Sequence, residues 1–240
     1  MRLRSWARAK QRLLTSATTF SAVGLLVAAA VIHPGFKETH VDLNDGGVWV
    51  TNTDMNLVGH LNFQSKTLDG GLMAASADFD ILQHSSSVLV SDRGNASLGR
   101  VKVSDVTLEP PQQLPGTAVP AFGEKAVALA DPGTGRLWVT QSSMLGSIDF
   151  DSQEPVVSDA KGIVATVGAD DVVHAADPAR GEVTTLHVNA TGGVDSHNTV
   201  QYEPIRNKEN LQVAAVGDQP VLFDADAGTL HLPGGRLAGR

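Results

Sequence analysis

The chain has 240 residues, 42% of them hydrophobic, a formal net charge of −8 and no cysteine. The absence of cysteine excludes a disulfide framework, a thiolate metal site and a cysteine nucleophile. After residue 12, 13 Lys and Arg oppose 26 Asp and Glu, and the resulting charge of −13 argues against a nucleic acid partner because it repels phosphate.

The first 32 residues join a basic segment to an apolar one. Residues 1–12 carry five cations, and residues 13–32 form a run of 20 without a charge. As a helix this run would be about 30 Å long, which matches the hydrocarbon core of a membrane. Because the cations favour the cytoplasm, we expect a single-pass plasma-membrane protein whose N-terminus is inside and whose residues 33–240 are extracytoplasmic.

Two alternatives to an uncleaved signal anchor are open for residues 13–32. The small residues Ala28–Ala30 suit a cleaved signal peptide, although the bulky Val31 and Ile32 continue the apolar run beyond them. A buried helix of a soluble domain is the other alternative, and the lack of a charged face argues against it. We expect the transmembrane signal anchor; a signal peptide would export the rest of the chain equally.

Residues 33–240 are expected to be all-β. Short Val-rich runs bounded by Gly, Asp, Asn or Pro recur, and no window shows convincing helical spacing of apolar residues. Five runs share a pattern of strand, polar turn and second strand, beginning at Val48, Val88, Leu137, Val172 and Val221. Their steps of 40, 49, 35 and 49 residues bracket the length of about 40–50 expected for a propeller blade.

The expected domain is therefore a β-propeller-like array of antiparallel four-stranded units. Val48–Thr51 and Leu137–Thr140 carry bulk on both faces, as a blade between two others requires. Two immunoglobulin-like sandwiches are the alternative. Five units in 208 residues fall short of the about 240–320 residues of a six- to eight-bladed ring, so we expect an incomplete array, or one that needs further sequence or a partner.

One stretch resembles a known family in residue detail. Val48-Trp-Val-Thr-Asn52, followed by Asn56-Leu-Val-Gly-His-Leu61, is similar to the Tyr-Val-Thr-Asn repeats of bacterial surface propellers, and Leu137–Thr140 is a partial second match. The whole segment 33–52 resembles the amino-terminal region of large actinobacterial cell-surface proteins. In those proteins a membrane anchor and propeller-like repeats precede immunoglobulin-like or fibronectin type III domains, so the resemblance implies a membrane-anchored surface protein.

No metal or cofactor site is predicted. His187 and His197, with Asp195 between them, are the best local zinc candidates, but a polar loop explains them equally well. The stretch Asp224-Ala-Asp226-Ala-Gly228 has the first half of a calcium loop and lacks the glutamate that completes an EF-hand. We interpret it as a hairpin turn.

No catalytic residue is predicted either. The serine cluster Ser85–Ser87 lies between two expected strands, which favours a turn over a nucleophile. Trp49 and Trp138 are expected at the same place in their units, where they would pack between blades.

We therefore expect a non-enzymatic surface scaffold or binding module, anchored through residues 13–32, with an unidentified protein or cell-wall glycan as partner. The alternative is an exported propeller enzyme, a lyase or glycoside hydrolase, with its site on the central axis. A sensor that signals across the membrane is disfavoured because only about 12 residues would lie in the cytoplasm.

Overall fold

The computed structural model describes residues 47–202, 211–217, 219–232 and 236–238. The expected membrane segment 13–32 lies outside these residues. Among the residues that are described, no helix is long and apolar enough to cross a membrane.

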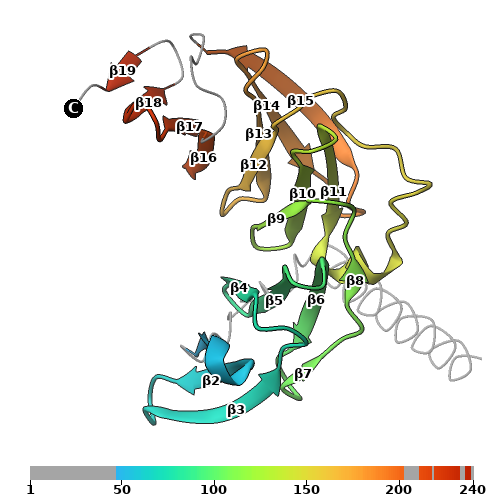
Figure 1. Cartoon of the computed structure of the whole chain (residues 1–240), viewed down its shortest axis with the longest axis vertical. Coiled ribbons are helices and arrows are strands. Elements are labelled where there is room, and N and C mark those ends of the chain that lie inside the picture. The colour runs from blue at the N-terminus through green and yellow to red at the C-terminus, as the bar shows by residue number, and fades with distance from the viewer. Residues whose placement is uncertain (1–46, 203–210, 218, 233–235, 239–240) are drawn as a thin grey trace, which may run out of the picture. The chain divides into compact units, whose positions relative to one another are not determined.

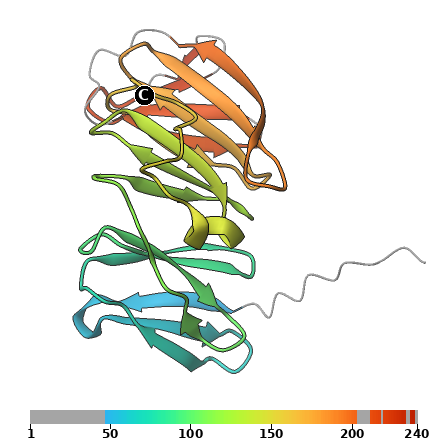
Figure 2. The same cartoon turned by 90° about the vertical axis from the view of Figure 1, so that its right-hand side faces the viewer.

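Five antiparallel sheets follow one another along the chain (Figures 1 and 2). Sheet 1 contains β1 (Val48–Asn52), β2 (Leu57–Asn62) and β3 (Thr67–Met73). Sheet 2 contains β4 (Phe79–His84), β5 (Ser87–Asp92), β6 (Ser97–Lys102), β7 (Thr107–Leu108) and β8 (Gln112–Gln113). Sheet 3 contains β9 (Val119–Phe122), β10 (Ala126–Asp131) and β11 (Arg136–Gln141).

The last two sheets have four strands each. Sheet 4 contains β12 (Val164–Val167), β13 (Val172–Asp177), β14 (Glu182–Val188) and β15 (Val194–Gln201), and sheet 5 contains β16 (Leu211–Val216), β17 (Gln219–Asp224), β18 (Thr229–Leu232) and β19 (Arg236–Ala238). Two 3-10 helices, η1 (Thr53–Met55) and η2 (Ser142–Ser147), follow β1 and β11. The structure thus confirms an all-β array of antiparallel sheets, and five sheets packed in chain order are not a pair of sandwiches.

A separate apolar cluster fills the space between each sheet and the next. The cluster between sheets 1 and 2 contains Trp49, and the cluster between sheets 2 and 3 contains Trp138. The cluster between sheets 3 and 4 contains Leu137, and the cluster between sheets 4 and 5 contains Leu222. The sheets also meet edge to edge, because β4 contacts both β1 and β9 while β12 contacts both β9 and β16. Each internal sheet is therefore buried on both faces, as the sequence predicted.

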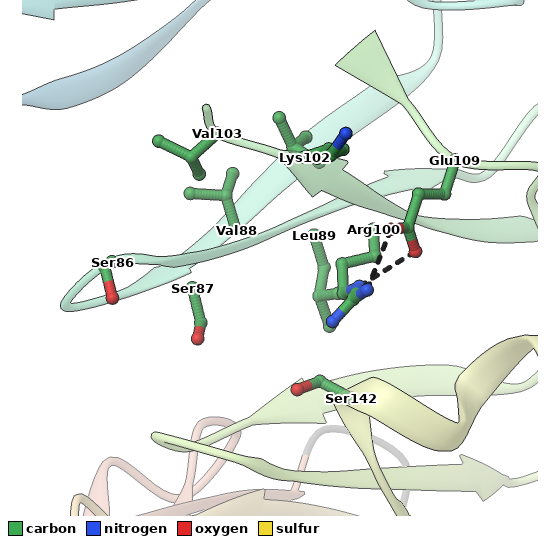
Figure 3. Close-up of a pocket in the computed structure, with 10 residues that line it drawn as sticks. Ser86, Ser87, Val88, Leu89, Arg100, Lys102, Val103, Glu109 and Ser142 are labelled. Atoms are coloured by element: carbon green, nitrogen blue, oxygen red, sulfur yellow. Dashed lines mark hydrogen bonds and ion pairs between the residues drawn. The ribbon is translucent and has the colours of Figure 1, made fainter. Parts of the chain in front are cut away.

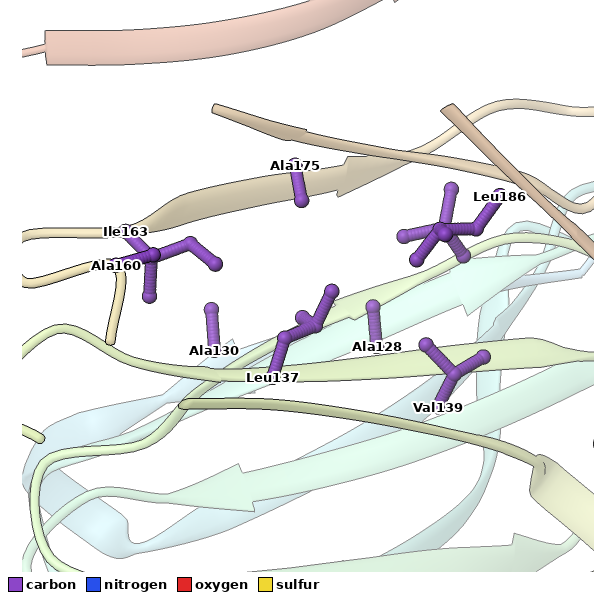
Figure 4. Packing of buried hydrophobic residues seen from close by; sticks show 9 residues of the cluster. Ala128, Ala130, Leu137, Val139, Ala160, Ile163, Ala175 and Leu186 are labelled. Atoms are coloured by element: carbon purple, nitrogen blue, oxygen red, sulfur yellow. The ribbon is translucent and has the colours of Figure 1, made fainter. Parts of the chain in front are cut away.

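Strand β10, the middle strand of sheet 3, contributes side chains to two interfaces. All six of its residues are buried. Val127 and Leu129 point into the cluster shared with sheet 2, whereas Ala128 and Ala130 point into the cluster shared with sheet 4. Figure 4 shows these alanines opposite Ala175 and Leu186 of sheet 4. Alternation of side chains along a strand produces this division directly.

One kind of turn recurs after the second strand of sheets 2–5 and after β1. The last strand residue is Asn52, Asp92, Asp131, Asp177 or Asp224, and its side-chain oxygen accepts backbone N–H groups two or three residues later. The fourth residue after it has a positive φ of 47–73°, and it is glycine in three of the five turns. Glycine adopts this left-handed conformation without steric cost.

The spacing of these turns along the sequence is more regular than the spacing of the strand starts from which the repeat was predicted. Asn52, Asp92, Asp131, Asp177 and Asp224 are separated by 40, 39, 46 and 47 residues. The stretch 224–228 is confirmed as one of these turns, since Asp224 accepts the N–H groups of Asp226 and Ala227 at 3.1 and 3.0 Å.

The third expected unit was placed wrongly. Its hairpin is β10–β11, and the residues after Leu137–Thr140 form the helix η2 instead of a second strand. This helix places Leu145 in the cluster around Trp138. Leu145, which the sequence pattern assigned to a second strand, therefore packs between the sheets from a helix. Trp49 precedes a repeat turn and Trp138 follows one, so they are not equivalent, although both pack between sheets as expected.

We predict that Asp131→Ala lowers the free energy of unfolding by about 2 kcal/mol, because it leaves turn donors without their buried acceptor. Asp131 is 2% exposed and accepts bonds from the backbone N–H of Gly133 and from the Thr117 and Thr134 hydroxyls. Urea unfolding measures the change. The exposed Asp54→Ala is the matched control, and an equal loss in both variants would contradict a role for the turn.

We also predict that acid weakens the fold through these turns. Burial alone would raise the pKa of Asp131, but hydrogen bonds from Thr134, Thr117 and Gly133 outweigh it and hold that pKa below its ordinary value of 3.8. The stabilising effect is complete above that ordinary value and is lost as the pH falls through the lowered one. The unfolding free energy of Asp131→Asn should therefore fall less steeply below about pH 4 than that of the unaltered chain; parallel curves would disprove this.

Candidate ligand-binding site

A cavity of about 220 Å³ lies between sheet 2 and the start of η2 (Figure 3). The β4–β5 turn brings Ser86 and Ser87 to its rim, and β6 supplies Arg100 and Lys102. Ser142, the first residue of η2, lies across the cavity from Arg100. The site is thus assembled from segments more than 50 residues apart in sequence.

Arg100 and Glu109 form an ion pair in the lining of the cavity, and the neighbouring Lys102 is paired with Asp105. The guanidinium donates two hydrogen bonds of 2.8 Å to the two carboxylate oxygens, and the Glu109 backbone N–H donates to the Arg100 carbonyl at 2.8 Å. The hydrogen bond from Arg100 lowers the pKa of Glu109. Two-point pairing fixes both planar groups, and the unused guanidinium N–H groups and carboxylate lone pairs can still bind a ligand.

Three hydroxyls complete the polar lining. The Ser86, Ser87 and Ser142 side chains make no hydrogen bond to any residue that the structure describes. Ser142 is held in place by its backbone, whose N–H donates to the Lys125 carbonyl at 2.7 Å. Hydroxyls both donate and accept, so together with Arg100 and Glu109 they can bind a ligand that carries several hydroxyls.

Apolar side chains form the rest of the wall. Val88, Leu89, Val101 and Val103 line the cavity beside the polar groups. Such a mixture suits a small molecule with polar edges and a C–H-rich face, because apolar walls bury area while a few polar groups fix orientation.

A second cavity, of about 390 Å³, lies between the first strands of sheets 2 and 3. Leu82, Val119 and Pro120 make it more apolar than the first. Its exposed cation, Arg93, is paired with Asp78 at 2.8 Å and lies 3.9 Å from Asp80. Asp92, also in its lining, already caps a repeat turn.

A histidine–carboxylate pair is present on sheet 1. His60 Nδ1 lies 2.6 Å from Asp69 Oδ1, and this hydrogen bond lowers the pKa of the exposed Asp69. The His60 ring is buried beside Trp49, with 5.1 Å between ring centroids. The pair is oriented as an acid–base group would be, but it lines none of the cavities described above.

The residues singled out from the sequence are placed differently. In the β14–β15 ladder His187 is opposite Ser196 and His197 is opposite Leu186, so the two histidines point to opposite faces and Asp195 binds Asn189 instead. The described part of the chain contains no group of three or more His, Cys, Asp or Glu placed to hold a metal. Ser85–Ser87 forms the expected turn, with a positive φ of 51° at Ser85.

Sequence reasoning missed the cavity that this turn borders. Ser86 and Ser87 were recognised only as turn residues, and no local spacing connects them with Arg100, Glu109 or Ser142.

No protein-family model and no curated protein matches this sequence. Solved structures do match. Virginiamycin B lyase from Staphylococcus aureus aligns with 79% of this chain and 67% of its own at 14% identity and a TM-score of 0.50. The dihydro-heme d1 dehydrogenase NirN aligns with 85% and 47% at 11% identity and 0.53, and Kluyveromyces lactis Hsv2p with 78% and 57% at 12% identity and 0.54.

The structural similarity to these proteins establishes the fold of the chain. The chain has a β-propeller fold. It spans about half to two thirds of the length of the matched structures. The propeller part of the expected resemblance is thus confirmed, whereas the comparisons give no support to immunoglobulin-like or fibronectin type III domains.

The comparisons also correct the prediction that the protein is not an enzyme. Two of the matched propellers are named as enzymes, a lyase and a dehydrogenase, so this fold is compatible with catalysis. The prediction was wrong because it depended on missing linear motifs. The residues of a propeller site come from strands that are far apart in the sequence, so a linear motif does not reveal them.

Proposed function

We propose that this chain is an extracytoplasmic β-propeller, tethered to the plasma membrane through residues 13–32, that binds a short glycan in the cavity of Figure 3. The observation that carries the glycan assignment is the lining of that cavity. Three serine hydroxyls and the Arg100–Glu109 ion pair line one cavity, and valine and leucine side chains form the rest of its wall.

The chemistry of a sugar fits this lining. Its ring hydroxyls can accept from Arg100 and donate to Glu109, and they can exchange either role with the serines. Its C–H face can lie against Val88 and Val101. A volume of about 220 Å³ admits one sugar residue, so a longer glycan would extend from the opening.

The tether supports a partner outside the cell. The five cations before residue 13 favour a cytoplasmic N-terminus, which would expose the acidic remainder to the cell wall. Glycans are abundant there, and binding them needs no basic surface. This agrees with the charge of −13 after residue 12.

Titration of the full chain in detergent with short N-acetylglucosamine oligomers tests the ligand, with calorimetry as the measurement. Arg100→Met should weaken binding at least about tenfold, because it removes charged hydrogen bonds while keeping the length of the side chain. Its thermal midpoint should change little, since the Arg100 and Glu109 side chains are 40% and 36% exposed. Mass spectrometry of the recovered oligomer shows whether it is also cleaved.

Arg93→Met is the matched control, because Arg93 is an exposed, ion-paired arginine that lines the other cavity. It should bind the oligomer as the unaltered chain does. If Arg93→Met abolished binding and Arg100→Met did not, the site would be the cavity between β4 and β9. Absence of binding to the unaltered chain, with soluble peptidoglycan fragments as the second probe, would refute glycan recognition.

Reporter fusions after Arg240 test the tether. Alkaline phosphatase should be active and green fluorescent protein dark, because the C-terminus is expected outside. Replacing the five cations of residues 1–12 by glutamine should reduce phosphatase activity. A fluorescent, phosphatase-negative pair of fusions to the unaltered chain would show that the proposed location is wrong.

A further inference from the structure

The second cavity lies at the opposite end of strand β5 from the cavity of Figure 3. Strand β5 begins at Ser87, which lines the cavity of Figure 3, and ends at Asp92, which lines the second cavity. Between them, the apolar cluster that contains Trp138 fills the space between sheets 2 and 3. Each of these two sheets also packs against a further described sheet on its other face. The two cavities are therefore separate, and each can bind its own ligand.

A buried serine hydroxyl lies in the lining of the second cavity. Ser91 is only 6% exposed, and its hydroxyl makes no hydrogen bond to any residue that the structure describes. It is opposite Asp80 in the β4–β5 ladder, and Leu82, two residues after Asp80, packs into the cluster between sheets 2 and 3. Ser91 and Asp80 therefore point toward sheet 3 from the same face of sheet 2. Because buried polar groups are normally hydrogen-bonded, a ligand that supplies a partner for Ser91 gains affinity.

The charge at the second cavity is negative. Asp80, Asp92 and Arg93 are the charged residues of its lining, and Asp78 is the ion-pair partner of Arg93. The Nε and Nη2 atoms of Arg93 both lie 2.8 Å from one carboxylate oxygen of Asp78, so the guanidinium is already engaged. Three carboxylates and one guanidinium leave an excess of negative charge, which attracts a cation.

Asp80 is the carboxylate that a ligand can reach. Asp92 already caps its repeat turn, where it accepts hydrogen bonds from Asn95. In Asp80, Oδ1 accepts the Ile81 N–H at 2.8 Å, whereas Oδ2 lies 3.9 Å from Arg93, too far for a hydrogen bond. The Asp80 side chain is 61% exposed. Its Oδ2 can therefore accept a hydrogen bond from a donor in the cavity.

Apolar side chains from both sheets form the rest of the wall. Leu82 comes from β4, Val119 and Pro120 come from β9, and Leu114 comes from the segment before β9. Pro120 is opposite Leu129 of the cluster between sheets 2 and 3, so it points toward sheet 2. The volume of about 390 Å³ falls in the lower part of the range of small-molecule sites, about 300–1,000 Å³. The cavity therefore suits one small molecule with an apolar body.

We propose that the second cavity binds a small organic cation, an ammonium group on an apolar body. Directly opposite residues of a ladder have Cβ atoms about 4.5–5.5 Å apart, so one ammonium group can donate to both Asp80 and Ser91. The apolar body would then lie against Leu82 and Pro120. A ligand carboxylate would instead meet the excess negative charge, since the guanidinium of the lining is already paired. This site shares no residue with the proposed glycan cavity and does not depend on it.

Titration of the full chain in detergent with phenethylamine tests the ligand class, with calorimetry as the measurement. Phenethyl alcohol and phenylacetate are the neutral and anionic analogues. We expect the amine to bind at least about tenfold more tightly than the alcohol, because charged hydrogen bonds are stronger than neutral ones. Tighter binding of phenylacetate than of the amine would overturn the proposal. So would the absence of binding by both phenethylamine and the longer phenylbutylamine.

Two variants with opposite effects locate the ammonium group. Asp80→Asn should weaken phenethylamine binding at least about tenfold and leave alcohol binding unchanged, because it removes the charge and keeps an acceptor for the Ile81 N–H. Arg93→Met should strengthen amine binding roughly threefold, because it removes a competing cation. Asp151→Asn is the matched control, since Asp151 is exposed and lines neither cavity. The reverse signs would mean that Arg93 holds an anion, and they would overturn the proposal.

Ser91→Ala tests whether the amine enters the cavity. It should weaken phenethylamine binding about fivefold, because a hydrogen bond to the ammonium is lost. The thermal midpoint should change little, since the hydroxyl has no hydrogen bond to lose within the described part of the chain. Unchanged amine binding would show that the ligand lies elsewhere.

A competition experiment keeps this proposal apart from the glycan. Phenethylamine should bind equally well in the presence of N-acetylglucosamine oligomers, because the two cavities lie at opposite ends of β5. Displacement of the amine by the oligomer would overturn the assignment of two separate sites. Amine binding can succeed where oligomer binding fails, and the reverse.

Discussion

A single sheet of this protein is apolar on both faces, and every other feature depends on covering both of them. The middle strands β5, β10 and β13 are buried almost throughout, which only a sheet on either side allows. Each sheet is therefore stable only as a member of a series. Burial of apolar area, at about 25 cal/mol per Å², supplies the free energy, and the four clusters show that it is spread along the series instead of being concentrated in one core.

The repeat turns keep the strands in register while the faces are filled. A buried carboxylate such as Asp92 would be costly alone, but it accepts bonds from Ser76 and from the Asn95 backbone and side chain. Because the side-chain period of a strand is two, a slip of one residue would exchange the two faces. The turn fixes the last residue of the strand and so determines which side chains meet which neighbour.

The fold was largely predictable because this pattern is local. The hairpins β1–β2, β5–β6, β13–β14 and β17–β18 were all expected from strand, turn and strand. The third hairpin was missed because Leu137–Thr140 looks like the start of a unit, while the turn at Asp131 is the better marker. The cavity was not predictable, since Ser142 reaches Arg100 and Glu109 of sheet 2 only after sheets 2 and 3 have packed.

Helix η2 replaces a strand where the other sheets keep the repeat, and this affects how freely the chain can vary. Residues in a ladder must satisfy a partner on each side, whereas Ser142, Met144 and Ser147 belong to a segment without that constraint. A substitution at Ser142, the η2 residue that lines the cavity, changes the polar lining at little cost to the sheets. A repeat protein can in this way alter what it recognises at one irregular segment while the regular part of its sequence stays the same.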